Sequence, residues 1–274
     1  MIRKGRRYTV ALTGVAKGDP WEQVVRRLLQ EAARAGVRPR LTLLDRGFWR
    51  VGVVRYLQAA RQPFVILMPC QGRKPEHPRG VGGTQVLCYQ KRSGWHTYTI
   101  QEDKSGRKAT VRVCVRVTPQ GRAQARKGRT RSGAGRQRPT RGPGRPYAFW
   151  GWQPASYAAV AESYRRRFAI ETTYRQVHQA RIRTSSRSPL LRLLYVGLAL
   201  VLRNVWVWVH QQFLARRRRG GREPQWGRLR FRALLGWLED VAVAVFGLAD
   251  RVRTEVPVPP SFPPPEPEAG FGKY

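Results

Sequence analysis

The chain has 274 residues, of which 41% are hydrophobic, and this is enough to build one large domain or two small ones. Its 53 Lys and Arg residues against 16 Asp and Glu residues give a formal net charge of +37. A globular protein with this charge repels itself unless a polyanion neutralises it. Nucleic acid is therefore favoured as the partner over an acidic protein or a membrane surface. Arg is used much more than Lys, so GC-rich coding accounts for part of the excess.

The cysteine and histidine content argues against a metal centre built from these residues. Cys70, Cys88 and Cys114 lie far apart without a CxxC pair, which supports neither a zinc ribbon nor a disulfide framework. We expect them to be buried and reduced, as in a cytoplasmic protein. The four histidines form no HExxH motif. Residues 1–7 are basic and show no signal peptide.

The first part of the chain alternates between strand and helix patterns. We predict a strand at 5–15, an amphipathic helix at 20–35, a short strand at 41–44 that ends at Asp45, a helix at 50–62 and an apolar strand at 63–70. This order describes an α/β layer with parallel strands.

The middle of the chain changes character. Residues 80–90, 94–101 and 108–118 are predicted to be three strands of an all-β insertion. Residues 122–146 consist almost only of small, polar and basic residues, which predicts a disordered loop or one that nucleic acid orders.

One long helix is predicted at residues 156–186, which lack Pro and Gly. At about 100° per residue, the side chains of Tyr164, Arg167, Glu171, Tyr174 and His178 fall within a stripe roughly 80° wide. Two interpretations stay open. The stripe belongs to a salt-bridged surface helix, or it presents a metal-binding carboxylate beside arginines that bind phosphate.

Residues 189–209 form the most apolar stretch. Arg192 and Arg203 interrupt it and leave ten uncharged residues between them, too few to cross a bilayer. We therefore predict a helix packed inside the protein, and no membrane partner.

The C-terminal part contains a basic linker at 215–224, one helix or two short ones at 231–251 and a proline-rich, disordered tail. The predicted divisions of the whole chain are 1–70, 71–121, 122–146, 147–214, 215–255 and 256–274.

Asp45 and Glu171 are the candidate catalytic carboxylates. An aspartate at the end of a buried strand points to the edge where α/β sheets hold ligands, although Asp45 could equally cap the helix that begins near Phe48. Together the two acids supply two of the three carboxylates that two-metal phosphodiester chemistry uses.

The order of these motifs resembles that of the DDE transposases of bacterial insertion sequences. The similar residues are LLDRGFW at 43–49, the β insertion, the spacing Tyr164-x2-Arg167-x3-Glu171 and RNVWVWV at 203–209. The nearest branch is insertion-sequence family four, whose signature Tyr-x2-Arg-x3-Glu-x6-Lys has His178 in its fourth position here. The resemblance covers roughly residues 5–210.

The resemblance implies an α/β, ribonuclease-H-like mixed sheet flanked by helices, with the β insertion before the glutamate helix and a helical C-terminal part. It implies two Mg²⁺ or Mn²⁺ ions held by two aspartates and a glutamate, with Asp45 as the second aspartate and Glu171 as the glutamate. It also implies cleavage and transfer of DNA strands.

The resemblance further implies how DNA is bound. Tyr164, Arg167, Arg175 and His178 would contact DNA, and a tryptophan would stack on an extruded base. Trp150 and Trp95 are candidates for this tryptophan, with core packing as the alternative for both. The implied partner is duplex DNA, as transposon ends and target, with a homodimer assembled on it. The implied location is the bacterial cytoplasm, at the nucleoid.

The first catalytic aspartate of the family has no obvious counterpart. Asp19 is expected to cap the helix that follows it. We therefore expect an N-terminally truncated transposase that binds metal weakly and whose own activity is open. The alternative is a non-catalytic nucleic-acid-binding protein that uses the basic loop 122–146 and exposed aromatic residues.

Overall fold

The protein was studied as a computed structural model, which describes residues 1–3, 6–73, 77–102, 106–119, 143–218 and 221–247. The chain divides into two compact units, Met1–Val209 and His210–Tyr274. Most of the predicted basic loop at 122–146 and the proline-rich tail at 256–274 lie outside the described residues.

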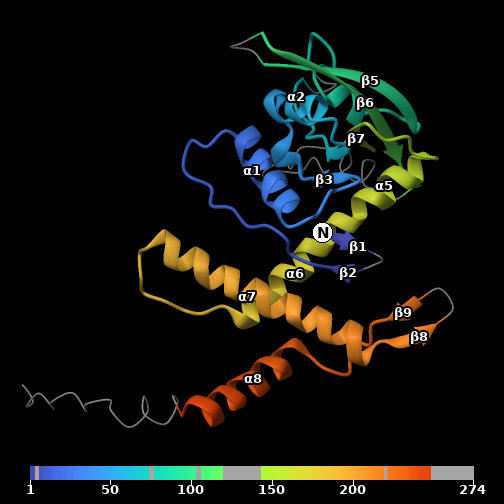
Figure 1. The fold of residues 1–274 in the computed structure, drawn as a ribbon. Helices are drawn as coiled ribbons and strands as arrows, with labels where there is room; N and C mark the ends of the chain where they lie inside the picture. The colour runs from blue at the N-terminus through green and yellow to red at the C-terminus, as the bar shows by residue number, and fades with distance from the viewer. Residues whose placement is uncertain (4–5, 74–76, 103–105, 120–142, 219–220, 248–274) are drawn as a thin grey trace, which may run out of the picture. The chain divides into compact units, whose positions relative to one another are not determined.

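A mixed five-stranded sheet forms the centre of the first unit (Figure 1). Its strand order is β3 (Thr42–Leu44), β4 (Phe64–Leu67), β7 (Gly144–Trp150), β6 (Lys108–Val117) and β5 (Gly94–Gln101). The pair β3–β4 is parallel and the other three pairs are antiparallel. The predicted α/β class is confirmed. The strands predicted at 94–101 and 108–118 are β5 and β6, and they join the same sheet as β3 and β4.

Helices cover both faces of this sheet, and the alternation of side chains along each strand decides which residue faces which helix. Phe64 and Ile66 of β4 share a buried cluster with α1 (Trp21–Arg34) and α2 (Val51–Ala59). Val65, between them, faces the other way and packs against α5 (Tyr157–Arg165). The predicted strands at 41–44 and 63–70 and helices at 20–35 and 50–62 are therefore confirmed.

The helix predicted at 156–186 begins as expected but is not continuous. Ser156 caps α5 by accepting the Ala159 N–H. After α5 come a 3-10 turn, η2 (Arg166–Phe168), then α6 (Ala169–Val177) and a last 3-10 turn, η3 (His178–Ala180).

The early end of this helix has a local cause. Beyond Ala180, hydroxyl groups bind the backbone in place of helical carbonyls: Thr184 Oγ1 accepts the Ser186 N–H and Ser186 Oγ accepts the Ser188 N–H. Ser and Thr compete with helix formation in this way, so the prediction of a helix to residue 186 was wrong.

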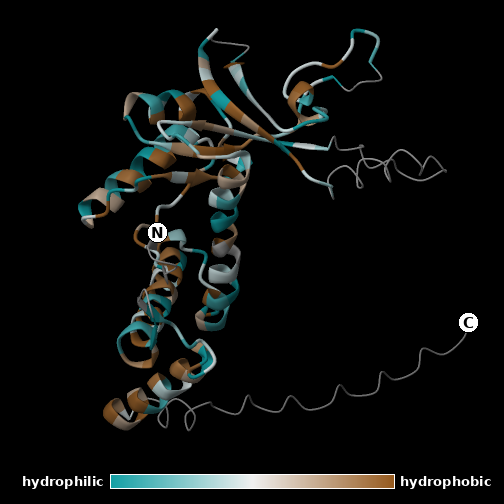
Figure 2. Ribbon diagram, turned by 90° about the vertical axis from the view of Figure 1, so that its right-hand side faces the viewer, coloured by the Kyte–Doolittle hydropathy of each residue, from teal (hydrophilic) through white to brown (hydrophobic). Residues whose placement is uncertain are grey.

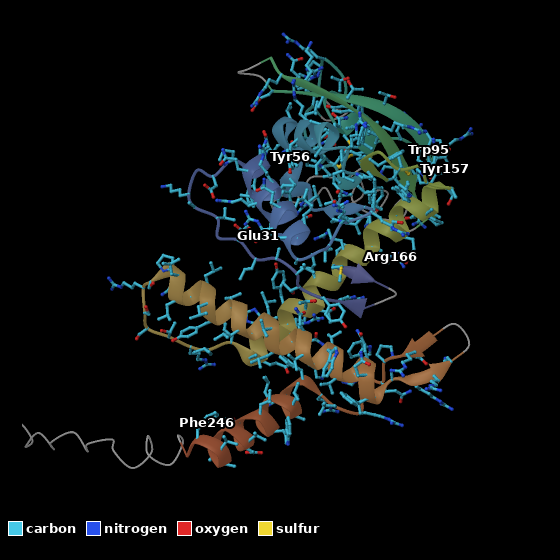
Figure 3. The ribbon with its side chains drawn as sticks, in the orientation of Figure 1. Glu31, Tyr56, Trp95, Tyr157, Arg166 and Phe246 are labelled. Atoms are coloured by element: carbon cyan, nitrogen blue, oxygen red, sulfur yellow. A yellow bond between two sulfur atoms is a disulfide. The ribbon has the colours of Figure 1, made fainter. Side chains whose placement is uncertain are left out.

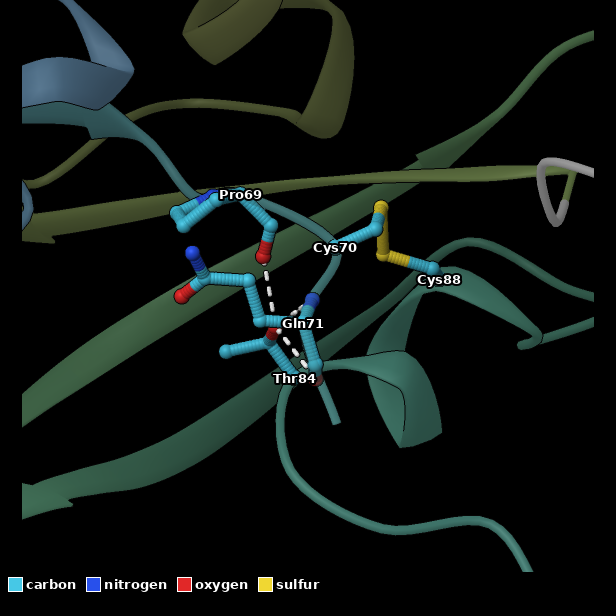
Figure 4. Close-up of a disulfide and its surroundings, with 5 residues drawn as sticks. All are labelled: Pro69, Cys70, Gln71, Thr84 and Cys88. Atoms are coloured by element: carbon cyan, nitrogen blue, oxygen red, sulfur yellow. Dashed lines mark hydrogen bonds between the residues drawn. A yellow bond between two sulfur atoms is a disulfide. The ribbon is translucent and has the colours of Figure 1, made fainter. Parts of the chain in front are cut away.

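Two predicted strands are also wrong. In place of a strand at 5–15 there is a two-residue hairpin, β1 (Ile2–Arg3) with β2 (Arg6–Arg7), and the following segment binds the side chain of Asn204 through Thr9. In place of a strand at 80–90 there is α3 (Gln85–Cys88). Its first turn is preceded by Thr84, whose hydroxyl bonds to the backbone of Pro69 and Gln71 (Figure 4).

The expectation of reduced cysteines is wrong as well. Cys70, just beyond β4, and Cys88, at the end of α3, form a disulfide with their Cα atoms 6.3 Å apart (Figure 4). The fold of the intervening loop brings them together, and their separation in sequence gave no sign of it. Cys114 is free and buried, as expected.

The apolar helix α7 (Pro189–Val209) is not packed inside as predicted. Figure 2 shows how apolar this helix is. One side of it carries exposed hydrophobic residues at helical spacing, namely Leu190, Leu194, Leu198, Val201 and Val205. The segment Pro189–Leu214 is long and apolar enough to cross a membrane, a test that core helices of soluble proteins also pass, and 28% of its most apolar window is buried.

Arg203 shows how the opposite side of α7 is used. Its guanidinium is buried, and it donates to Gln176 Oε1 at 3.1 Å and to the Arg7 carbonyl at 2.8 Å. Ala199 and Leu200 pack on Val177 of α6. The arginine that interrupts the apolar stretch is thus a contact between α7 and the rest of its unit.

The second unit contains β8 (Arg216–Arg218), β9 (Gly221–Glu223) and α8 (Phe231–Phe246). The predicted linker at 215–224 is therefore an antiparallel hairpin. The predicted helix at 231–251 begins as expected and ends at Gly247, whose φ of 60° lies in the left-handed region that favours glycine. His210 is buried and its Nε2 lies 2.8 Å from the Leu229 carbonyl oxygen.

Candidate nucleic-acid interface

Asp45 lies at the carboxyl end of β3 and has two separate contacts. Its Oδ1 accepts the Arg46 N–H at 2.8 Å, so it caps the 3-10 turn η1 (Arg46–Phe48). Its Oδ2 lies 3.7 Å from Nη1 of Arg167, which comes from the turn after α5. The capping role that the sequence left open is confirmed. The strand end and the arginine of the long helix, 122 residues apart in sequence, lie together.

Aromatic rings hold the Arg167 guanidinium in place. Its Cζ lies 5.3 Å from the centroid of the Tyr164 ring and 4.9 Å from that of Phe168. The Arg167 side chain is only 14% exposed, whereas the Asp45 side chain is 49% exposed. Cation–π contacts of this kind orient a guanidinium without consuming its N–H donors.

Tyr164 forms the floor of this arrangement. It is 2% exposed, and its ring centroid lies 5.4 Å from that of Tyr147 on β7. Burial raises the pKa of the Tyr164 phenol to about 12, against the opposing effect of the Arg167 charge. The phenol is therefore neutral at physiological pH and acts as packing for Arg167.

Glu171 lies in α6, four residues beyond Arg167, and its side chain is outside the described part of the chain. The predicted convergence of the two carboxylates thus stays a prediction.

The described residues do not fit the implied divalent-metal site. They contain no group of three His, Cys, Asp or Glu side chains placed to share an ion. Asp45 alone is at hand: one oxygen caps a turn, and the other faces a guanidinium that would repel a divalent cation. No metal-dependent step is derived from this set.

The two further DNA-binding candidates on the helix are exposed. Arg175 is in the last turn of α6 and His178 begins η3. His178 lines a cavity of about 440 Å³, whereas Arg175 does not line it.

The two tryptophan candidates lie on opposite faces of the sheet. Trp150 packs against the core beneath α1 and α2, away from Tyr164, so the structure does not bring it to the site. Trp95 on β5 lies on the α5 face and is 40% exposed. Its ring centroid is 4.7 Å from that of Tyr157 and 5.7 Å from that of Phe149 (Figure 3).

The sequence patterns did not single out the cavity beside His178. Its lining is His178, Arg181, Ile182, Arg183, Thr184, Arg192, Tyr195 and Val196. Arg181 and Arg183 fall within the helix predicted at 156–186 and belong to none of the predicted sites. The signal that could have found the cavity is their spacing of two, once residue 181 is known to be extended.

A second cavity, of about 640 Å³, lies among α1, α2 and β6. It is also basic, with Arg26, Arg55 and Lys108 in its lining, but it includes Glu22, which pairs with Arg26 at 3.4 Å. Carboxylates therefore neutralise part of its charge.

No family model matches this chain, and no curated protein matches it at a significant level. The function therefore has to be inferred from the residues and their geometry.

Proposed function

We propose that this protein is a DNA-binding protein of the insertion-sequence transposase type. The observation that carries the proposal is the contact of Arg167 with Asp45, because it joins the two motifs on which the resemblance depends. A salt-bridged surface helix alone would not require its arginine to contact two aromatic rings and an aspartate at the carboxyl end of β3.

The sheet supports a ribonuclease-H-like assignment in its order of elements. β3, α2 and the parallel strand β4 follow one another, and the antiparallel strands β5, β6 and β7 come before the helix that carries Arg167. β3 is at the edge of the sheet, so its outer side is open to another strand.

The chemistry of phosphate binding supports the choice of DNA. Arg167 keeps guanidinium N–H groups beyond the one that faces Asp45, and a planar fork held in place by two neighbouring rings is well suited to a phosphodiester. The net charge of +37 supplies the long-range attraction.

A second candidate function is nucleic-acid binding without strand cleavage. The ion pair between Asp45 and Arg167 favours it, because a carboxylate used to orient an arginine and to cap a turn is not free for a metal. A protein of the proposed lineage could bind DNA without cleaving it. A cleavage assay distinguishes this function from that of an active transposase.

Binding is tested with a fluorescent duplex titrated with the full chain between about 50 and 200 mM salt, where each phosphate contact adds about 0.9 to the slope of log affinity against log salt. Arg167→Ala should lower the affinity several-fold more than Arg26→Ala, a matched removal of one charge from the second cavity. Equal losses would contradict a special role for Arg167.

Cleavage is tested on a supercoiled plasmid with Mg²⁺ or Mn²⁺. Nicking that Asp45→Asn abolishes would favour an active transposase. No nicking, with tight DNA binding retained, would favour the non-catalytic form.

A further inference from the structure

The cavity beside His178 differs from the rest of this basic surface in having no carboxylate in its lining. Arg181, Arg183 and Arg192 make no ion pair with any carboxylate whose side chain the structure describes, whereas Arg165 pairs with Glu162 and Arg167 with Asp45. Three like charges around one hollow repel one another, and a bound anion removes this cost. The cavity is therefore suited to an anion.

The backbone explains why these arginines converge. Arg181 has extended geometry, with φ −72° and ψ 116°, at the point where the helical turns end. The four consecutive residues 181–184 line the cavity, and Arg181 and Arg183 are two of them. Arg192 and Tyr195 come from the first turns of α7 at a spacing of three, which places them on one helix face.

Arg192 is held in place by the segment that leads into α7. Its Nε donates to the Ser186 carbonyl at 2.8 Å, which leaves its two terminal nitrogens for a ligand. The same segment is fixed by its own hydroxyl–backbone bonds at Thr184, Ser186 and Ser188. A guanidinium fixed through Nε can present its two terminal NH2 groups to a phosphate as a fork.

The distance between the cavity and Arg167 indicates how far apart two DNA phosphates bound at these positions would lie. Arg167 in η2 and His178 at the start of η3 are eleven residues apart with α6 between them, which corresponds to about 16 Å at the α-helical rise of 1.5 Å per residue. With about 3.4 Å of duplex axis per base pair, this spans up to about five base pairs.

We infer that the cavity lined by Arg181, Arg183 and Arg192 holds a backbone phosphate of duplex DNA, up to about five base pairs from a phosphate bound beside Arg167. The inference rests on the proposed DNA-binding function and adds a second, separate grip on the duplex. It uses arginines that lie outside the motif on which the resemblance was based.

The test compares two full-length variants that each lose three positive charges. One is Arg181→Ala, Arg183→Ala and Arg192→Ala, and its matched control is Arg26→Ala, Arg55→Ala and Lys108→Ala in the second cavity. Both are titrated with the same duplex over a range of salt. The cavity variant should lower the salt slope by about 0.9, the contribution of the one phosphate that the cavity holds, and the affinity about ten- to a hundredfold, well beyond the control.

The outcomes are distinct. Equal losses in the two variants, with tight binding by the unaltered chain, overturn the cavity inference and leave the proposed function standing. An unaltered chain that binds no duplex overturns both. If the cavity variant loses affinity only for duplex RNA of the same sequence, or only for inorganic pyrophosphate, and binds duplex DNA as the unaltered chain does, the assignment to DNA is overturned.

A second variant covers the case in which the alanine variant does not fold. Replacing the same three arginines by lysine keeps the charge and removes the bidentate fork. Several-fold weaker DNA binding with an unchanged salt slope supports the inference, and unchanged affinity overturns it.

Discussion

Asn204 on α7 binds both backbone polar groups of Thr9: its Oδ1 accepts the Thr9 N–H at 3.0 Å and its Nδ2 donates to the Thr9 carbonyl at 2.7 Å. A side-chain amide thus takes the place of a neighbouring strand. With Arg203 bound to the Arg7 carbonyl, α7 holds the N-terminal segment through two consecutive residues.

This contact predicts that Asn204→Ala destabilises the unit Met1–Val209 by about 1–3 kcal/mol, because two backbone groups lose their partners. Urea unfolding measures the loss, and hydrogen exchange should show faster exchange of the Thr9 amide. Asn204→Asp keeps the acceptor and loses the donor, so its free energy of unfolding should lie between those of the unaltered chain and of Asn204→Ala. Unchanged Thr9 exchange in the alanine variant would contradict the contact.

The disulfide predicts a definite count of thiols. Under denaturing, non-reducing conditions one thiol should react, that of Cys114, and three should react after reduction. Replacing Cys70 and Cys88 by serine should cost about 3 kcal/mol, the value expected for a loop of this length. Cys114→Ala is the control that keeps the bond. Three reactive thiols before reduction would show that the disulfide is absent.

In the native state, the thiol of Cys114 should be unreactive. Burial raises its pKa to about 12, so very little thiolate is present at neutral pH. A thiol reagent added to the folded chain should therefore modify it only at the rate of unfolding. Fast modification without unfolding would contradict its burial.

Tyr164 predicts a loss of stability at alkaline pH. Its phenol has a pKa of 10 when unfolded and about 12 when folded, so the unfolded state loses its proton first. Stability is then complete below pH 10 and falls as the pH rises from 10 to 12, by up to about 2–3 kcal/mol. Tyr164→Phe should flatten this fall, measured by urea unfolding across that range. Tyr174→Phe removes an exposed phenol and should leave the fall as steep.

The two sides of α7 predict opposite responses to substitution. Leu194→Gln and Leu198→Gln, on the exposed side, should change stability by no more than about 0.5 kcal/mol and reduce the binding of a hydrophobic dye. Leu200→Ala, on the buried side, should cost about 2–5 kcal/mol. Similar costs on both sides would mean that the exposed side is covered.

The sequence predicts those elements whose burial follows a simple period. The apolar run at 63–70, the alternating residues of β5 and the helix α1 were found because their patterns depend on local periodicity. The contact of Asp45 with Arg167 was not predicted: the resemblance paired Asp45 with Glu171 and assigned Arg167 to DNA, whereas the structure joins Asp45 to Arg167.

The wrong predictions share a physical reason, which is that side-chain contacts distant in sequence decided the local structure. Asn204 binds the segment expected to be a strand, and Thr84 binds two backbone groups ahead of α3. The disulfide depends on the same loop. The exposed side of α7 was missed because an apolar composition predicts burial without saying which residues are covered.

The alternation of side chains along β7 limits how that strand can pair. Phe149 faces Trp95 and Tyr157, and Trp150 faces the core on the other side. A slip of one residue would exchange them, placing the larger indole in the space of a phenyl ring and dissolving the aromatic stack. Phe149 and Trp150 together therefore fix the register of β7 on β4. The same register fixes the position of Tyr147, whose ring contacts that of Tyr164.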